Sequence, residues 1–391
     1  MSLADLSTYG ISADRGFLCD FDAASVPLDG EVALARDIAM RLPEWLPTGR
    51  IRELLVDRLP MTSAEDIAAL NDIQARMAMV HYSFLVQSYV WGSPAPLTSL
   101  PAQLAVPISA LAKRLGQKPL LQYSGYVLDN WALVDPARGL ALDNIYMIQK
   151  FAGGLDEAWF VLIHVAIEAR AAAALQLFGP LIEAAASKDA ENLLLLLEQL
   201  AGIWEGIKAI FDRMPEQCDP HVYFHRVRPY IHGWKDNPAL SAGLVYAGVE
   251  DFAGQPQVFR GQTGSQSSIV PSMDALLGVG HAADPLKAYL DELHAYRPPA
   301  HRRFIDDVRT SSRVRQFVSR SGVRSLTAAY NDTIQAVAGF RSKHLEYAAS
   351  YINKQGGKSA GNDSEVGTGG TPFMKYLKKH RDETAAMMLP C

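Results

Sequence analysis

The sequence predicts an all-α protein in which a smaller, mostly helical N-terminal domain precedes a large helical domain. Two observations carry this prediction. Long windows of the chain repeat apolar residues with the 3.6-residue period of a helix, whereas runs that alternate like a strand are scarce. With 49% hydrophobic and 20% charged residues over 391 positions, the chain can bury a sizeable core, which excludes general disorder.

The predicted helices follow one another along the chain with recognisable start signals. Ser63 is followed three residues later by Asp66, which is typical of a capping box, and Asp156 and Asp189 are plausible N-caps. The helical windows are residues 31–42, 63–90, 155–180, 188–213, 284–294, 301–319 and 324–352.

A proline-rich segment separates the first two helices from the rest. Residues 92–119 contain five prolines, which interrupt helices. We interpret this segment as the crossing from a domain of residues 1–115 to a domain of residues 116–391. An ordinary long loop inside one domain is the alternative.

Residues 354–371 are rich in Gly, Ser and small polar residues, which predicts a flexible loop. A helix should follow, with Thr371 as its N-cap, Pro372 at its first position and a basic last turn. A mobile loop joined to a late helix can act as a lid over a site. A disordered linker to a terminal helix explains the same composition equally well.

Charge, cysteine content and the N-terminus narrow the class of protein. Lys+Arg 37 against Asp+Glu 42 gives a net charge of -5, which argues against a nucleic-acid partner. Three cysteines and no CxxC favour a reducing compartment and exclude thiolate zinc sites. The start lacks the features of a secretory signal, and the apolar runs 159–166 and 193–197 are much shorter than a membrane span. We therefore expect a soluble, cytoplasmic protein with no membrane partner.

Two histidines lie on apolar helix faces. Helical spacing puts His344 on one face with Phe340 and Tyr347, and it puts His164 on an apolar stripe with Phe160. An imidazole buried there must bond a core group or ligate something, because burying it without a partner is costly. From the pattern alone, a hydrogen-bonded core histidine is favoured for both positions.

The surroundings of these histidines fit a haem better than another metal. Zinc and non-haem iron sites need His, Cys, Asp or Glu side chains that converge tightly, and only Glu168 lies one turn from His164. A haem needs one axial imidazole and an apolar slot. The motif HVYFH at 221–225 could pair two imidazoles on a helix, but no obvious third ligand follows it.

Two further segments have the composition of a ligand contact. Arg228 follows Tyr223 and Phe224 in a region dense in aromatic and basic residues, which would suit a carboxylate attached to an aromatic body. An Arg stacked on aromatic rings or paired at the surface is about as consistent with this pattern. Residues 259–278 form a Gly- and Ser-rich approach to a helix that starts near Val270, without the ending of a P-loop, and an ordinary turn is the favoured interpretation.

Taken together, several blocks of sequence resemble one family. The chain resembles the indoleamine 2,3-dioxygenases, haem enzymes that open the indole ring of tryptophan. The blocks keep the family order over about residues 120–385, whereas the first hundred residues match weakly. They are YSGYVLDNW (123–131), RPYIHGWKDNPALSAGLVYAGV (228–249), GSQSSIVPSMDALLG (264–278), RPPAHRRFI (297–305), RSKHLEYAASYI (341–352) and GTGGTPFMKYLKKHR (367–381).

The resemblance implies roles for individual residues around a haem b. His344 stands where the family has its proximal haem ligand, and Arg341 with Asp274 matches an arginine near a haem propionate and its partner, with Ser265 also at the cofactor. Arg228 matches the residue that binds the substrate carboxylate, and Thr368 matches the threonine that closes over the substrate. The implied substrate pocket is completed by Tyr123, Tyr126, Phe160, His164, Tyr223, Phe224, Gly261, Thr263 and Gly264.

Two positions depart from the mammalian type of this family. His164 stands where those enzymes have a serine, and Tyr126 stands where they have a cysteine. A distal histidine is similar to that of the related tryptophan 2,3-dioxygenases, where it hydrogen-bonds the indole N–H. The implied pocket is therefore a tight hybrid, which argues against broad acceptance of 1-substituted indoles.

The resemblance thus implies oxidative cleavage of the indole C2–C3 bond of L-tryptophan, or of a related indoleamine, to N-formylkynurenine. His164, Arg228 and Thr368 are the expected catalytic residues. O2 and an electron donor that keeps the iron ferrous are the expected partners, and the protein is expected to be a monomer or weak homo-oligomer. Three alternatives remain: a haem oxygenase of secondary metabolism that acts on a substituted tryptophan or another indole, a non-catalytic haem sensor, and a helical interaction protein without a cofactor.

Overall fold

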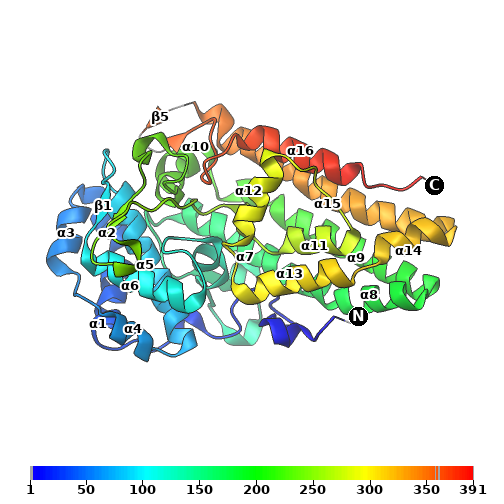
Figure 1. Ribbon diagram of the computed structural model, residues 1–391, viewed down its shortest axis with the longest axis horizontal. Coiled ribbons are helices and arrows are strands. Elements are labelled where there is room, and N and C mark those ends of the chain that lie inside the picture. Colours follow the sequence, from blue (N-terminus) through cyan, green and yellow to red (C-terminus); the bar gives the residue numbers. More distant parts are fainter. Residues whose placement is uncertain (1–2, 357, 360–361, 391) are drawn as a thin grey trace.

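The computed structural model describes residues 3–356, 358–359 and 362–390, and it confirms the all-α class. In the described part, the strands form only three two-stranded pairs. Short helices gather at one end of an elongated molecule, and longer helices run side by side through the rest (Figure 1). The strand pairs are β1 (Ser99–Leu100) with β4 (Val245–Tyr246), β2 (Trp131–Leu133) with β3 (Ile145–Met147), and β5 (Lys358–Ser359) with β6 (Asn362–Asp363).

The N-terminal helices are shorter than the periodicity predicts. The predicted helix 63–90 is two helices, because Leu70 is extended and Asn71 starts a second capping box with Gln74. The capping box of Ser63 and Asp66 is confirmed. The helices are α1 (Gly30–Met40), α2 (Leu42–Trp45), α3 (Ile51–Arg58), α4 (Ala64–Ala69), α5 (Asp72–Trp91) and α6 (Ala102–Leu115).

Helix α6 lies inside the proline-rich segment 92–119. The five prolines of this segment therefore interrupt helical structure less than their number predicts. Pro107 stands within the helix itself. Helix α6 packs on α4 and α5, and β1 pairs in parallel with β4, which comes from the other side of the predicted boundary. The division into residues 1–115 and 116–391 remains a prediction.

Helix α5 connects the two parts of the molecule. Its residues from Met77 to Trp91 are all buried, as expected for a helix that is apolar all round. Near its end, the side-chain N–H groups of Gln87 and Trp91 both donate to the backbone carbonyl of His232 at 3.0 Å. The N-terminal part therefore supports the loop that follows Arg228.

The second part of the chain contains the long helices. Two predicted helices are each split. The window 155–180 covers α7 and only the first three residues of α8, and 301–319 spans α13 and α14, because Ser312 is extended. The helices are α7 (Leu155–Gln176), α8 (Phe178–Ser187), α9 (Ala190–Phe211), α10 (Pro220–Val222), α11 (Ile269–Leu277), α12 (Pro285–His294), α13 (Pro299–Ser311), α14 (Val314–Ser321), α15 (Arg324–Tyr351) and α16 (Phe373–Ala385).

Of the two predicted N-caps in this part, one is confirmed. The Asp189 carboxylate accepts the backbone N–H of Asn192 at the start of α9. The prediction for Asp156 was wrong, because Gly154 is the N-cap of α7. Asp156 lies inside the first turn and accepts the backbone N–H of Asp219 at 2.7 Å, so its carboxylate ties down the segment before α10.

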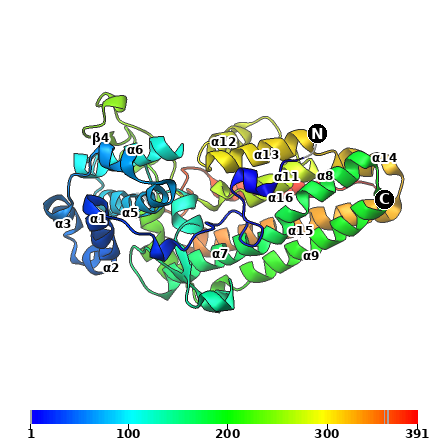
Figure 2. The same ribbon diagram turned by 90° about the horizontal axis from the view of Figure 1, so that it is seen from below.

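Helices α7, α9 and α15 form the centre of the molecule. Helix α9 packs against both others, and α16 covers another side of α15 (Figure 2). The stretch Leu155–Ser187 is long and apolar enough to cross a membrane, although the uninterrupted apolar runs predicted otherwise. Two thirds of its most apolar window (67%) is buried inside the protein, as is typical of a core helix.

Two π-helical turns lie at the segments that the sequence marks as ligand contacts. They are Ser124–Leu128, directly after Tyr123, and Tyr223–Val227, directly before Arg228. A π turn inserts an extra residue into the helical repeat and re-aims the following side chains, and such turns are frequent at functional sites.

The C-terminal helix begins differently from the prediction. Pro372, with no side-chain cap, precedes α16, so Thr371 is not its N-cap. The last turn carries no basic residue, because the basic residues Lys378, Lys379 and Arg381 lie earlier in the helix. Thr371 is buried instead, next to the loop that leads into the helix.

Candidate functional site

His344 faces a cavity from the middle of α15. Its imidazole has no hydrogen-bond partner within the described part of the chain. Burial lowers the pKa of His344 to about 4, so the imidazole is neutral at pH 7. Two adjoining cavities of about 130 and 630 Å3 are both lined by His344. A core histidine would have a protein partner, so this imidazole is placed to ligate a bound group.

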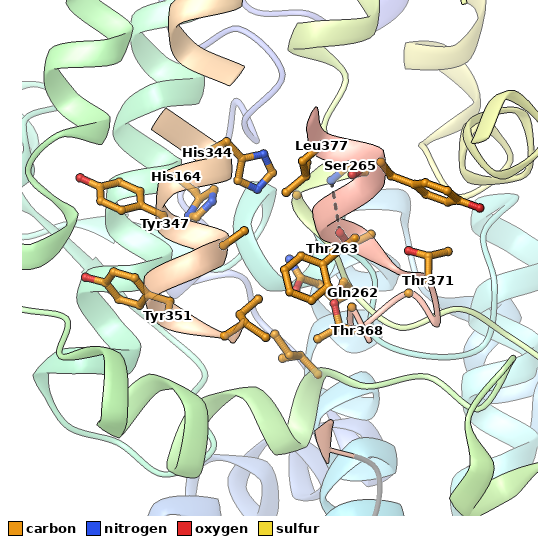
Figure 3. Close-up of a pocket in the computed structure, with 18 of the residues that line it drawn as sticks. His164, Gln262, Thr263, Ser265, His344, Tyr347, Tyr351, Thr368, Thr371 and Leu377 are labelled. Carbon is orange, nitrogen blue, oxygen red and sulfur yellow. Dashed lines mark hydrogen bonds between the residues drawn. The ribbon is translucent and has the colours of Figure 1, made fainter. Parts of the chain in front are cut away.

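His164 reaches the same cavities from α7 (Figure 3). Its Nδ1 lies 2.7 Å from the backbone carbonyl of Phe160. A carbonyl only accepts, so Nδ1 carries the proton in this bond, and Nε2 of the neutral ring is left as an acceptor. Burial lowers the pKa of His164 below its ordinary value, which favours the neutral form. Phe211 lies beside both histidines, with its ring centre 6.3 Å from that of His164 and 6.2 Å from that of His344.

Most of the predicted site residues come together around these cavities. The smaller cavity is bounded by an aromatic pair, in which the ring centres of Phe160 and Tyr223 are 4.6 Å apart. The predicted residues that line one or both cavities are Tyr123, Phe160, His164, Tyr223, Thr263, Gly264, Ser265, Asp274, Arg341, His344 and Thr368.

Four predicted residues lie behind the cavity wall. Tyr126 is fully buried against Phe160, and its hydroxyl has no hydrogen-bond partner in the described structure. Gly261 packs so closely on Gly233 that a Cβ on Gly261 would lie 2.2 Å from the backbone nitrogen of Gly233. The absence of a side chain at Gly261 therefore lets the two chain segments approach each other. Phe224 and Arg228 are buried beside each other, with the guanidinium 5.4 Å from the ring centre.

The guanidinium of Arg228 is occupied by the chain itself. Its Nη1 donates to the side-chain oxygen of Asn362, and its Nη2 donates to the backbone carbonyl of Val366 at 2.5 Å. Its Nε has no partner among the described residues, and no carboxylate pairs with it there. Two neutral oxygens thus occupy a guanidinium fork whose geometry suits a bidentate carboxylate.

Residues 362–371, which we call the glycine loop, lie over the smaller cavity, which Gly367, Thr368 and Gly369 line. The Thr368 hydroxyl donates to the backbone carbonyl of Gln262 at 2.6 Å, and the Thr368 carbonyl accepts the backbone N–H of Gly233. Arg260 donates to the carbonyl of Gly369 at 2.6 Å. The loop is therefore hydrogen-bonded to two segments, around residues 233 and 260, whose neighbours Ile231 and Gln262 line the cavity.

Sequence reasoning noted the carboxylate of Glu168 one helical turn after His164 but gave it no role. Glu168 is fully buried, and one of its oxygens accepts the hydroxyls of Tyr123 at 2.9 Å and Ser267 at 2.8 Å. Burial raises its pKa to about 7. The carboxyl group fixes Tyr123 beside His164, and only the fold shows this, because Ser267 is 99 residues away in sequence.

The far end of the larger cavity is charged. Arg341 donates to Asp274 at 2.7 Å, and His281 lies between Asp274 and Glu383, with its Nδ1 2.6 Å from the Glu383 carboxylate. Although burial opposes it, Arg341 lowers the pKa of Asp274. One Asp274 oxygen has no partner within the described structure.

Sequence reasoning missed the residues that only complete the walls. No local signal in the sequence marks them as lining a cavity. They include the apolar or aromatic residues Phe211, Met214, Ile231, Tyr289 and Leu377 and the polar residues Gln262 and His380. The HVYFH pair does bring its rings together, with centres 4.3 Å apart. No group of three metal-ligating side chains is found among the described residues.

Comparison with known proteins decides the family. The family model described as indoleamine 2,3-dioxygenase matches residues 5–387 of the chain.

The chain belongs to the indoleamine 2,3-dioxygenase family.

Similar proteins include indoleamine 2,3-dioxygenase 1 of Rattus norvegicus, which is 33% identical over 98% of this chain and 96% of its own length. Indoleamine 2,3-dioxygenase acdA of Aspergillus candidus is 32% identical over 98% of both chains. The enzyme of Saccharomyces cerevisiae is 30% identical over 97% of this chain and 93% of its own length. The likeness therefore includes the N-terminal part, where the motifs alone matched weakly.

Membership makes this protein an enzyme of a haem-dependent dioxygenase family that uses O2 and indole substrates. The cavities fit a haem on three observations. His344 is an unpartnered imidazole, the larger cavity of about 630 Å3 is largely apolar beside it, and Arg341 with Asp274 stands at its polar end.

Proposed function

We propose that this enzyme cleaves the C2–C3 bond of the indole ring of L-tryptophan with O2. Both oxygen atoms enter the product, so that tryptophan plus O2 gives N-formylkynurenine with no atom lost. One observation carries the proposal: two neutral histidines on α7 and α15 face one cavity, and only one of them is tied to the protein. The imidazole of His344, which has no protein partner in the described structure, suits an axial ligand. The imidazole of His164, which is held by the Phe160 carbonyl, suits an acceptor that orients the substrate.

The cofactor we propose is haem b, which when bound supplies the redox chemistry that lets O2 react with an aromatic ring. His344 would hold its iron as the proximal ligand. Arg341, Asp274 and Ser265 would lie at its polar edge, since all three line the larger cavity.

The protein contributes orientation and exclusion of water. His164 Nε2 would accept the indole N–H, because the Phe160 carbonyl holds the proton on Nδ1. The rings of Phe160 and Tyr223 would pack on the indole. Thr368 and its loop would cover the substrate, and the Arg228 fork would bind the carboxylate after Asn362 and Val366 leave it.

A second substrate class is favoured by the closed form of the site. Among the described residues that line the smaller cavity, only His164, His344 and His380 can carry positive charge, and burial lowers the pKa of all three. A neutral indole would fit such a cavity without any displacement of Asn362. This agrees with a haem oxygenase of secondary metabolism, for which the expected products carry one or two added oxygens.

Product analysis decides between these functions. Ferrous, haem-loaded enzyme is incubated with O2 and one of four compounds: tryptophan, tryptamine, indole or 1-methyltryptophan. The masses of the products are measured by mass spectrometry. We expect two added oxygens on tryptophan, with the absorbance of N-formylkynurenine, and little conversion of 1-methyltryptophan, which lacks the N–H. Conversion of indole but not tryptophan would favour the second class, and haem loading without any indole product would exclude both.

The axial role of His344 has its own test. His344→Ala should lose tight haem binding, seen as loss of the Soret band. His164→Ala should retain it, because His344 would still hold the iron. Full haem retention by His344→Ala would show that the proximal assignment is wrong. We further propose a cytoplasmic enzyme, monomeric or weakly associated, that needs an electron donor to keep its iron ferrous.

A further inference from the structure

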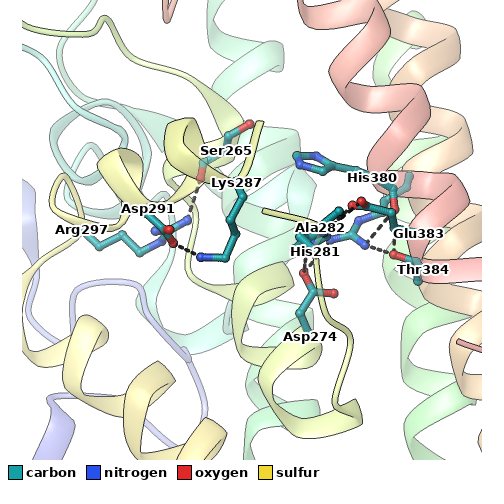
Figure 4. Close-up of polar contacts among 11 residues, drawn as sticks. Ser265, Asp274, His281, Ala282, Lys287, Asp291, Arg297, His380, Glu383 and Thr384 are labelled. Atoms are coloured by element: carbon teal, nitrogen blue, oxygen red, sulfur yellow. Dashed lines mark hydrogen bonds and ion pairs between the residues drawn. The ribbon is translucent and has the colours of Figure 1, made fainter. Parts of the chain in front are cut away.

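Arg297 is a buried arginine beside the larger cavity, at the loop between α12 and α13. Only 2% of it is exposed. Its Nε donates to the backbone carbonyl of Ser267 at 3.1 Å. Its Nη2 donates to the carbonyl of Ser265 at 2.7 Å (Figure 4). Its third nitrogen, Nη1, has no hydrogen-bond partner in the described structure, and the residue lines the cavity.

This guanidinium differs from the other cations that line the cavity. Arg341 pairs with Asp274, Lys287 with Asp291, and Arg309 with Asp306. Among the described residues, no carboxylate lies within ion-pair distance of Arg297. Asp306 is near enough to favour its charge, but that carboxylate contacts Arg309 and His294 instead.

A buried charge without a partner is costly, so an anion from outside the chain is the natural complement. Burial lowers the pKa of Arg297 to about 10, which still leaves the group protonated at neutral pH. Two backbone carbonyls disperse this charge but do not neutralise it. The cavity in front of it, of about 630 Å3, is therefore set to receive a carboxylate or a similar anion.

We infer that Arg297 binds a propionate carboxylate of the haem. This inference rests on the proposed haem site, whose polar edge already contains Arg341 with Asp274. Haem carries two propionates, and the cavity presents two buried arginines, one with an acidic partner and one without. Arg297 also holds the carbonyl of Ser265, so the same side chain positions the loop and meets the cofactor.

The test compares haem with its dimethyl ester, in which both propionates are neutral. Apoprotein is titrated with each compound, and affinity is read from the Soret band. Wild type should prefer haem, and Arg297→Met should reduce that preference about tenfold, the size expected for a lost charge-assisted hydrogen bond. Affinity for the dimethyl ester should change little. Lys287→Met is the matched control, because Lys287 lines the same cavity but has Asp291 as its partner.

The outcomes separate this inference from the proposed function. If Arg297→Met weakens both compounds equally, Arg297 only supports the Ser265 loop and the inference is wrong. If wild type does not distinguish the two compounds, the inference is wrong whatever the variant does. Arg297→Lys guards against misfolding, because it keeps the charge and should keep most of the preference. If wild type binds neither compound, the haem site itself fails, and this inference fails with it.

Discussion

At the scale of single residues, the two histidines could be found from sequence because a polar side chain on an apolar helix face stands out. Their different roles could not, because these depend on whether each ring has a partner. His164 has the Phe160 carbonyl, and His344 has none in the described structure. The roles of Glu168 and Arg297 could not be predicted for the same reason, because each depends on atoms that the fold brings from distant positions.

Glu168 leads to a prediction about pH and stability. Its pKa is about 7 in the folded protein against 4.5 ordinarily, so the folded state binds a proton that the unfolded state has lost between these values. Stability should therefore fall as pH rises from about 4.5 to 7. Glu168→Gln keeps a neutral group that accepts from Tyr123 and Ser267, so it should remove this loss.

Thermal unfolding of both proteins from pH 5 to pH 8 measures the effect. As pH rises, the free energy of unfolding of Glu168→Gln should increase relative to that of wild type, by up to about 3 kcal/mol. Tyr123→Phe serves as a control, because it removes one hydrogen bond but retains the carboxyl group. A difference between Glu168→Gln and wild type that stays constant with pH would contradict the raised pKa.

At the scale of elements, helical periodicity placed most helices but missed their interruptions. The residues around Leu70 and Ser312 keep the apolar repeat of a helix. Their extended backbone depends on capping and packing, which the spacing of apolar residues does not indicate. The glycine loop was correctly placed as a segment before the last helix. Its hydrogen-bond partners could not be predicted, because they are Arg228, Arg260 and the backbone carbonyl of Gln262, which are far away in sequence.

The loop leads to a prediction about substrate choice. In the closed form, Asn362 occupies the Arg228 fork and also bonds the Phe224 carbonyl at 2.8 Å. A substrate carboxylate must replace this amide, so the two compete for the same guanidinium. Asn362→Ala should therefore lower the KM for tryptophan, by about threefold to tenfold if the lost contact is an ordinary hydrogen bond.

Steady-state kinetics with paired substrates tests this. The KM for tryptamine, which has no carboxylate, should not fall, because it does not need the fork. Glu365→Ala is the control on the same loop, since that residue is exposed. If Asn362→Ala instead raises the KM of both substrates, Asn362 helps to build the site and does not compete with the substrate.

At the scale of the whole molecule, composition and period were sufficient for the all-α class, whereas the relation between the two parts needed the structure. Helix α5 is buried from Met77 to Trp91 and contacts the loop at His232, so the core continues across the predicted boundary at residue 115. The prolines of 92–119 suggested a separation, but α6 lies within this segment, and β1 from the same segment pairs with β4 from beyond the predicted boundary.

A single cooperative unfolding transition is therefore expected, with Arg76 as one of its links. From α5, Arg76 donates to both oxygens of Asp129, just after the first π turn, and its guanidinium also lies 4.9 Å from the ring centre of Phe21. Only 7% of the Asp129 side chain is exposed. Arg76→Met would leave that carboxylate buried without its partner, at a cost of about 3 kcal/mol, which corresponds to a fall of several degrees in Tm.

Thermal unfolding of haem-loaded protein, followed by far-ultraviolet circular dichroism and by the Soret band, tests the coupling. In wild type and in Arg76→Met the two signals should change together, because a break at α5 removes support from the loop at His232. Lys113→Met is the control: its pair with Asp251 also crosses the boundary, but with side chains 76% and 65% exposed it should contribute less than about 1 kcal/mol. Two separate transitions, with haem retained through the first, would show that residues 1–115 unfold on their own and that α5 does not join the parts into one cooperative unit.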